Sequence, residues 1–143
     1  MQLFTLQFET TQNFDNNLKT LVQLIEETSL GCIVLAPELC LTGYAYERVD
    51  DAVQISLQAF DQLLLLSQQR TIITTLTTKN EINQYFNTLY VFHKGKVAHT
   101  QSKHKLFVLQ DERKYFTSGN QEDIKIFEIN GIKIFLYLLD FQK

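Results

Sequence analysis

Glu38 stands at a position where a carboxylate could do chemistry. The apolar run 33–36 predicts a buried strand, and Pro37, which cannot donate to a sheet ladder, ends it. The turn signal Thr42-Gly43-Tyr44 follows shortly afterwards. Ligands of open α/β sheets usually bind at the carboxyl ends of the strands. Glu38 is therefore a candidate catalytic residue, and a surface carboxylate at a strand-to-loop junction is the alternative that these residues leave open.

A second group of ionisable residues, Lys103-His104-Lys105, lies further along the chain. A fixed lysine ammonium can stabilise the oxyanion of a tetrahedral intermediate. The same three residues could equally form a solvated basic patch. Glu112 follows in the charged run 111–114, and runs of this kind are typical of exposed turns.

The cysteines and histidines offer weaker candidates. Cys32 lies on the strand before Glu38 and Cys40 just after that residue, so both are expected to be small core residues. In a chain without an export signal we expect both thiols to be reduced. The histidines lack supporting ligands at metal-site spacing, and two of them lie on a hairpin that is expected to be solvated, so we expect no metal and no cofactor. These histidines are His93, His99 and His104.

The expected elements around these residues alternate between strands and helices. A strand–helix–strand unit within about 35 residues implies parallel neighbouring strands and an α/β fold. The stretch 45–51 is expected to be a polar connection. Apolar patterns predict strands at 3–8, 32–36 and 71–78, helices at 15–25 and 53–70, and hairpins at 85–100 and 123–139 around Lys94-Gly95 and Asn130-Gly131.

The composition excludes several classes of protein. The 143 residues, 45% of them hydrophobic, suffice for one core, and no linker or repeat interrupts them, so we expect one domain, 1–143. A net charge of -3 with mixed signs gives no case for nucleic-acid binding. No run approaches the roughly 20 apolar residues of a membrane span. The amino terminus lacks the features of a signal peptide. The sequence thus predicts a cytoplasmic protein without a membrane or nucleic-acid partner.

The segment 37–44, Pro-Glu-Leu-Cys-Leu-Thr-Gly-Tyr after an apolar strand, resembles the first signature of the nitrilase, or carbon–nitrogen hydrolase, superfamily. The resemblance implies that Glu38 is the general base of a Glu-Lys-Cys triad. The segment 103–107 is similar to the second signature, with Lys103 as the catalytic lysine and Lys105 as the alternative if the register shifts.

Two further stretches fit the same family. The segment 111–119 is similar to one that carries a supporting glutamate in many members, which would be Glu112 here. Asn87 and Gly95 fit an Asn at the start of the family's hairpin and a Gly at its turn.

The resemblance also implies a nucleophile that this sequence lacks. The third signature is a glycine-containing strand that runs into Ile-Cys-Tyr-Asp with the cysteine as nucleophile. Here Gly131 begins the strand, but Leu139, or Leu138 in another register, stands where the cysteine belongs. A hydrocarbon side chain has no nucleophilic atom. The resemblance therefore implies a homologue of hydrolases that act on a small amide or nitrile, inactive as this chain alone.

The fold implied by the resemblance is the amino-terminal half of an αββα sandwich, a mixed sheet with two helices on one face. We expect a chain truncated within the nucleophile strand. The loss of pattern after Ile134 indicates a frameshifted or decayed gene, and the segment 137–139 can be encoded so that a one-base shift reads Ile-Cys. The alternative is a non-catalytic remnant or subunit whose uncovered sheet face associates with a second copy or a partner chain.

Overall fold

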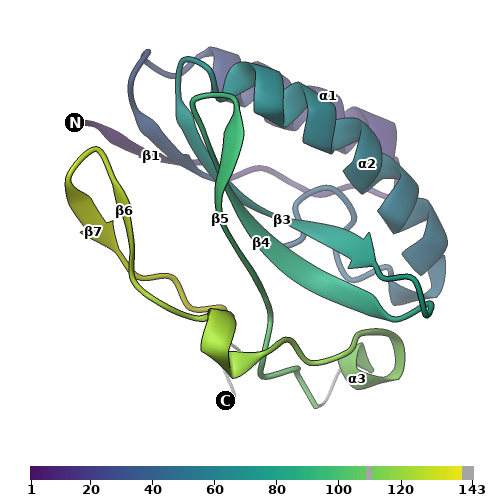
Figure 1. Ribbon diagram of the computed structural model, residues 1–143. Helices are drawn as coiled ribbons and strands as arrows, with labels where there is room; N and C mark the ends of the chain where they lie inside the picture. Colours follow the sequence, from purple (N-terminus) through teal and green to yellow (C-terminus); the bar gives the residue numbers. More distant parts are fainter. Residues whose placement is uncertain (109–110, 140–143) are drawn as a thin grey trace.

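The main element of the protein is a mixed five-stranded sheet, seen in a computed structural model that describes residues 1–108 and 111–139 (Figure 1). The strand order is β1-β2-β3-β4-β5. The first three strands run parallel, and β4 and β5 are each antiparallel to the preceding strand. The strands are β1 (Leu3–Thr5), β2 (Ile33–Leu35), β3 (Thr71–Lys79), β4 (Tyr85–His93) and β5 (Lys96–Ser102).

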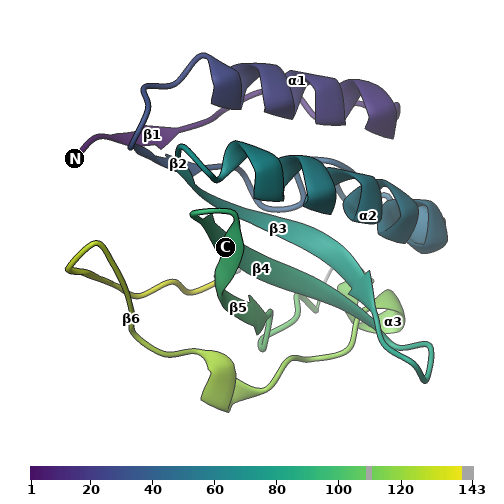
Figure 2. The ribbon, with the colours of Figure 1, turned by 45° about the horizontal axis from the view of Figure 1, so that its top comes forward.

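Two helices cover one face of this sheet, as the sequence predicted (Figure 2). α1 (Phe14–Glu26) connects β1 to β2, and α2 (Val49–Leu66) connects β2 to β3. Asn13 caps α1, because its side-chain oxygen accepts a hydrogen bond from the N–H of Asn16 at 3.0 Å. The apolar sides of both helices pack on the sheet, and burying this apolar surface stabilises the fold. The core between them includes Leu21, Ile25, Leu63, Ile72 and Phe92.

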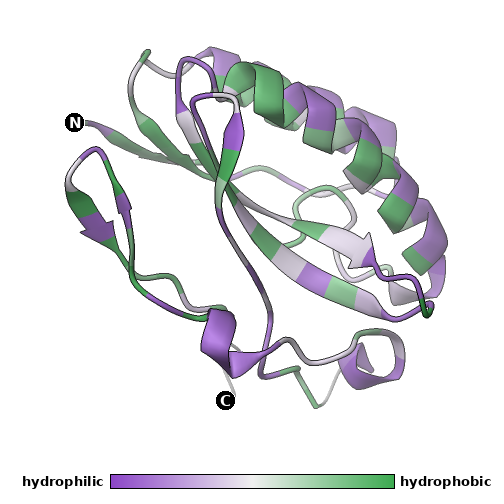
Figure 3. Cartoon of the chain, in the orientation of Figure 1, coloured by the Kyte–Doolittle hydropathy of each residue, from purple (hydrophilic) through white to green (hydrophobic). Residues whose placement is uncertain are grey.

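Alternation along the strands sends side chains to two different faces. Val34 and Ile72 belong to the core under the helices, whereas Ile33 and Ile73 belong to a second apolar cluster on the opposite face. Figure 3 shows the corresponding change of hydropathy from residue to residue along β4. The candidate site lies on the face opposite the helices, as the contacts below show.

A second hairpin, β6 (Phe127–Ile129) and β7 (Ile132–Ile134), lies on the side of the sheet away from the helices (Figure 2). Its turn is Asn130-Gly131, and both residues have positive φ, as the two-residue hairpin loop requires. Beyond β7 the side chains alternate in burial. Those that pack against the second apolar cluster are Ile134, Leu136 and Leu138, and those that are exposed are Phe135, Tyr137 and Leu139.

Several boundaries differ from the predicted ones for physical reasons. β1 ends at Thr5 rather than residue 8, because Pro37 limits the strand beside it. The stretch 45–51, expected as a polar connection, contains the 3-10 helix η1 (Tyr46–Arg48) and the start of α2. The polar residues of this stretch did not indicate that the ring of Tyr46 is buried. That ring packs against Phe116, which is distant in sequence.

The second predicted hairpin is shorter than expected. Its first strand, β6, begins at Phe127 rather than at residue 123. The 3-10 helix η2 (Gln121–Asp123) precedes it, and the Asn120 side chain caps that helix by accepting from the N–H of Glu122. β7 ends at Ile134, five residues before the predicted end of its strand. Within the part of the chain that the structure describes, no helix combines the length and apolar character needed to cross a membrane.

Candidate active site

The carboxylates of Glu38 and Glu112 both contact the ammonium group of Lys103. Lys103 Nζ lies 3.0 Å from Glu38 Oε1 and 3.2 Å from Glu112 Oε1. The side chains of Lys103 and Glu112 are 2% and 1% exposed, whereas that of Glu38 is 22% exposed. Lysine and glutamate are almost never buried so deeply unless they are paired. The three residues form one buried ion-pair cluster whose solvent-accessible member is Glu38.

Glu38 is held in place by the backbone that follows it. Pro37 ends the pairing of β2, and Leu39 then adopts φ 50°, a left-handed conformation that is unusual for such a side chain. The N–H of Leu39 donates to Thr75 Oγ1 on β3 at 2.7 Å, and its carbonyl accepts from the N–H of Gly43, also at 2.7 Å. These hydrogen bonds fix the turn that carries Glu38 against the sheet.

Lys103 directly follows β5 and lies between two segments. Its N–H donates to the carbonyl of Asn87 on β4 at 2.7 Å, and its carbonyl accepts from the N–H of Gly119 at 2.8 Å. A Cβ at position 119 would lie 2.2 Å from the carbonyl oxygen of Ser102, so only glycine permits this approach. The backbone of Lys103 is therefore fixed on both sides.

Glu112 begins the short helix α3 (Glu112–Tyr115). Its Oε1 accepts from Lys103 and its Oε2 accepts from the N–H of Phe107, so the carboxylate closes the loop between these two residues. The residue is thus not part of a solvated turn. Lys105, the alternative lysine, is exposed, and Lys103 is the lysine that the structure brings to both glutamates.

Asn87 is a site residue to which the sequence assigned no chemical role. Its Nδ2 donates to Glu38 Oε1 at 2.7 Å, and the residue is fully buried. Its Oδ1 is buried without a hydrogen-bond partner among the described residues, which costs about 1–3 kcal/mol. The sequence did contain one sign of this role. Asn87 places a polar amide on the same face of its strand as the apolar residues Leu89 and Val91.

Tyr46 is a residue near this site that the sequence reasoning did not single out. Its ring stacks on Tyr115 with the centroids 6.0 Å apart and meets Phe116 edge-on at 5.7 Å. Burial and the nearby negative charge of Glu112 raise the pKa of its hydroxyl well above the usual range. Tyr46 therefore stays a neutral phenol beside the charged cluster.

A family model of the carbon–nitrogen hydrolases matches residues 3–138, nearly the whole chain. The chain belongs to the carbon–nitrogen hydrolase family. It is 28% identical over 106 residues to the "hydrolase in agr operon" of Staphylococcus lugdunensis, covering 71% of this chain and 45% of the relative. It is 27% identical over 122 residues to the 2-oxoglutaramate amidase of Bacillus subtilis (strain 168), covering 82% and 46%. The chain thus spans about half the length of these curated relatives.

Solved structures of carbon–nitrogen hydrolases confirm the expected fold. An amidase from Nesterenkonia sp. superposes with a TM-score of 0.75 at 16% identity, covering 94% of this chain and 54% of that protein. A CN-hydrolase superfamily protein from Xanthomonas campestris gives a TM-score of 0.75 at 20% identity, covering 92% and 50%. At these identities the likeness concerns the fold alone.

From the sequence we expect Leu139, or Leu138 in another register, at the position of the nucleophile, and both residues lie beyond the end of β7. Leu139 is 59% exposed, and Leu138 packs against the second apolar cluster. Gln101 Nε2 donates to the carbonyl of Leu136 at 2.9 Å, so this segment is attached to β5 two residues before Lys103. The segment therefore lies beside the strand that leads into the charged cluster.

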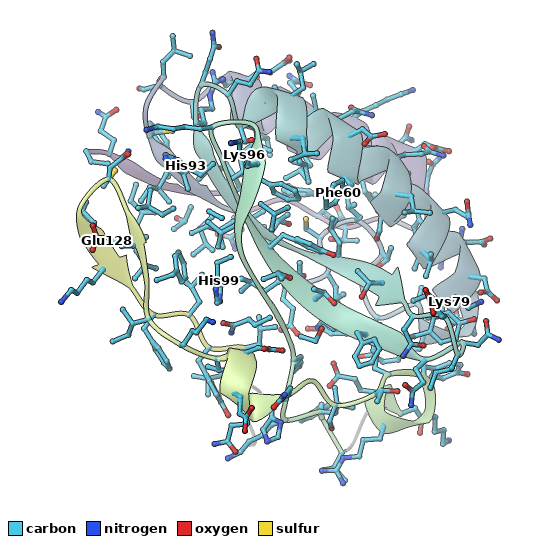
Figure 4. The ribbon with its side chains drawn as sticks, in the orientation of Figure 1. Phe60, Lys79, His93, Lys96, His99 and Glu128 are labelled. Carbon is cyan, nitrogen blue, oxygen red and sulfur yellow. The ribbon has the colours of Figure 1, made fainter. Side chains whose placement is uncertain are left out.

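The histidines differ partly from expectation. His99, expected to be solvated, is buried: it stacks on Phe127 with the centroids 4.4 Å apart, and its Nε2 lies 2.8 Å from Gln101 Oε1. Figure 4 shows His99 between β5 and the β6–β7 hairpin. The expectation failed because that hairpin covers the strand. Across residues 1–108 and 111–139, no group of three or more histidine, cysteine or acidic side chains is arranged to hold a metal ion.

Both cysteines are buried, and Cys40 lies 3.8 Å from the hydroxyl of Thr74. Burial raises the pKa of the Cys40 thiol to about 11. At pH 8 its thiolate fraction is therefore about a hundredfold lower than that of a free cysteine.

We expect iodoacetamide to alkylate Cys40 correspondingly slowly in the folded protein, with the rate rising about tenfold per pH unit towards pH 11. Mass spectrometry of timed samples measures this, with urea-unfolded protein as the control. Fast labelling of Cys40 at pH 8 in the folded chain would contradict the expectation that Cys40 is an unreactive core residue.

Proposed function

We propose that this chain is a homologue of amide-cleaving carbon–nitrogen hydrolases that supplies a general base, a lysine and a supporting glutamate, but no nucleophile. The observation that carries the proposal is the Lys103 ammonium between the carboxylates of Glu38 and Glu112. A surface patch would leave these charges in water, whereas here two of the three are almost completely buried. The similarity to a relative named an amidase supports an amide as the class of substrate.

In an intact member of the family, which also supplies the cysteine, residues equivalent to these three would each have a distinct part in the reaction. The equivalent of Glu38 accepts the proton of a cysteine thiol while the sulfur bonds to the amide carbon, and that of Lys103 stabilises the negative charge that develops on the carbonyl oxygen. The carbon–nitrogen bond then breaks, and the nitrogen leaves with a proton as ammonia or an amine. Water hydrolyses the remaining thioester, which releases the acid and restores the thiol. Glu112 holds the ammonium of Lys103 in position.

We propose that Leu139, or Leu138 in another register, occupies the nucleophile position and that the chain alone therefore has no turnover. The proposal is tested by introducing a cysteine at position 139. A glutamate-to-glutamine mutant of the amidase from Nesterenkonia sp. AN1 shows the result of Michael addition of acrylamide at its active-site cysteine. The adduct itself can therefore form without a glutamate carboxylate, and the informative quantity is the rate at which it forms. In a Leu139→Cys variant, Glu38 would deprotonate the new thiol, and we expect acrylamide to add to it at least tenfold faster than in Leu139→Cys/Glu38→Gln.

The control for register is Leu138→Cys, with and without the Glu38→Gln change. Intact-mass spectrometry gives the rate of adduct formation, and peptide mapping separates the new cysteine from Cys32 and Cys40. Equal rates with and without the Glu38 carboxylate in both registers would overturn the proposal. Ammonia released from glutamine or another simple amide by the unmodified chain at an enzyme-like rate would overturn the predicted inactivity.

The second candidate is a subunit without catalytic activity that associates with another chain. It is favoured by the exposed apolar side chains of Phe135, Tyr137 and Leu139 and by an apolar cavity of about 400 Å³ beside them. That cavity is lined by residues that include Leu3, Ile33, Leu35, Ile73, Ile134 and Leu136. A monomer in light scattering at high protein concentration would argue against self-association.

A further inference from the structure

Two asparagines, Asn17 and Asn87, are buried almost completely, and they differ in how their side chains are used. Asn17 is fully engaged: its Oδ1 accepts from the N–H of Thr11 at 2.9 Å, and its Nδ2 donates to the carbonyls of Thr11 and Leu41, both at 2.8 Å. Asn87 makes one side-chain hydrogen bond, to Glu38, and its Oδ1 has no partner within the described ranges. A buried polar group left in this state calls for an explanation other than packing.

Asn87 contacts both of the residues that would do the chemistry. Its side-chain Nδ2 donates to Glu38 Oε1 at 2.7 Å, and its main-chain carbonyl accepts from the N–H of Lys103 at 2.7 Å. Because Asn87 lies within β4, both contacts are made by a residue whose backbone is fixed by the sheet. One rigid residue therefore sets the position of Glu38 relative to Lys103.

The two oxygens of Glu38 are in different surroundings. Oε1 accepts both from Asn87 Nδ2, at 2.7 Å, and from Lys103 Nζ, at 3.0 Å, so these two donors converge on the same oxygen of the carboxylate. A lysine ammonium has three donors on a rotating group, so Lys103 alone could bind either oxygen of the carboxylate. The planar amide of Asn87 donates in one direction and so distinguishes the two oxygens.

We propose that Asn87 is a positioning residue of this site, which holds Glu38 Oε1 together with Lys103 and makes Oε2 the oxygen that accepts the proton. The inference rests on the proposed role of Glu38 as the base. This positioning role explains why a polar amide is found at position 87, on a strand face whose next two residues are the apolar Leu89 and Val91. The unpartnered Oδ1 is the consequence of keeping an N–H donor at that point.

The test is the substitution Asn87→Leu, which keeps the approximate volume and removes both the donor and the unpartnered oxygen. In protein labelled with ¹³C at the glutamate carboxyl carbons, the Glu38 resonance is assigned by its loss in Glu38→Gln. We expect Asn87→Leu to shift or broaden this resonance at neutral pH, because the carboxylate becomes free to rotate. If Asn87→Leu does not fold, Asn87→Ala removes the same donor without adding bulk.

Asn17→Leu is the matched control, since it also removes a buried asparagine. It breaks more hydrogen bonds, so it is expected to destabilise the protein more than Asn87→Leu and yet to leave the Glu38 resonance in place. The inference is overturned if the folded Asn87 variant keeps the unmodified Glu38 resonance, or if the Asn17 variant moves it equally.

A second readout separates this inference from the proposed function. In the Leu139→Cys background, Asn87→Leu is expected to slow acrylamide addition at least fivefold. A rate that depends on Glu38 but not on Asn87 would overturn the positioning role and leave the proposed function standing. A rate that depends on neither, together with a shifted Glu38 resonance, would overturn the base role of Glu38 and confirm only that Asn87 orders its carboxylate.

Discussion

Replacing Lys103 with methionine is expected to lower the free energy of unfolding by about 3–5 kcal/mol, the range typical of breaking a buried ion pair on one side. The change leaves the carboxylates of Glu38 and Glu112 without their common counter-charge. The unpaired charge of Glu112 destabilises the folded state more than that of Glu38, because the Glu112 side chain is only 1% exposed. Urea unfolding followed by circular dichroism measures the change in free energy.

The control for the Lys103 prediction is Lys79→Met. Lys79 also contacts a carboxylate, that of Asp50 at 3.2 Å, but this pair lies at the surface. Exposed pairs contribute little, because water and salt already screen the charges. A second variant, Lys103→Met/Glu112→Gln, removes one of the two stranded charges and is expected to recover part of the loss. A Lys103→Met protein as stable as Lys79→Met would show that the buried cluster is not needed for folding.

The order of the elements could be predicted because the hydrophobic pattern is local. The helical spacing of Leu18, Leu21 and Ile25 and the β-branched run at 71–78 each identify an element without knowledge of the rest. The α/β class followed from these patterns, whereas the mixed sheet with two helices on one face was implied by the family resemblance, and both are confirmed. Their ends could not be predicted so well, because tertiary partners such as those of Tyr46 decide where an element begins.

The site residues depend on contacts between distant parts of the chain. Lys103 meets Glu38 across 65 positions, and Asn87 meets it across 49. The motif resemblance named Glu38, Lys103 and Glu112, which the structure brings together, although their catalytic roles stay predictions. No motif described what Asn87 donates to, because hydrogen-bond partners follow from strand register and not from spacing along the chain. His99 was misjudged for the same reason, since a segment about 30 residues away covers it.

Replacing Gly119 with alanine is expected to destabilise the protein by about 1–3 kcal/mol, as overpacking of a close contact does. The added Cβ would lie 2.2 Å from the carbonyl oxygen of Ser102 and 2.6 Å from its carbonyl carbon. These are backbone atoms of the neighbouring segment, so no side chain can rotate away. The segment has to move, and the hydrogen bond from the Gly119 N–H to the Lys103 carbonyl is strained or lost.

The consequence for the site distinguishes this variant from one that is merely less stable. Because the Lys103 carbonyl is held by Gly119, a shift of the segment displaces the lysine backbone and changes the surroundings of Glu38. We therefore expect Gly119→Ala to move the carboxyl ¹³C resonance of Glu38 as well as to lower the denaturation midpoint. Ser118→Ala, at the exposed neighbouring position, is expected to stay within about 0.5 kcal/mol of the unmodified protein and to leave that resonance unchanged. A Gly119→Ala protein with an unchanged midpoint would mean that the segment 117–119 does not hold Lys103, and the geometry of the charged cluster would then depend on Asn87 and Glu112 alone.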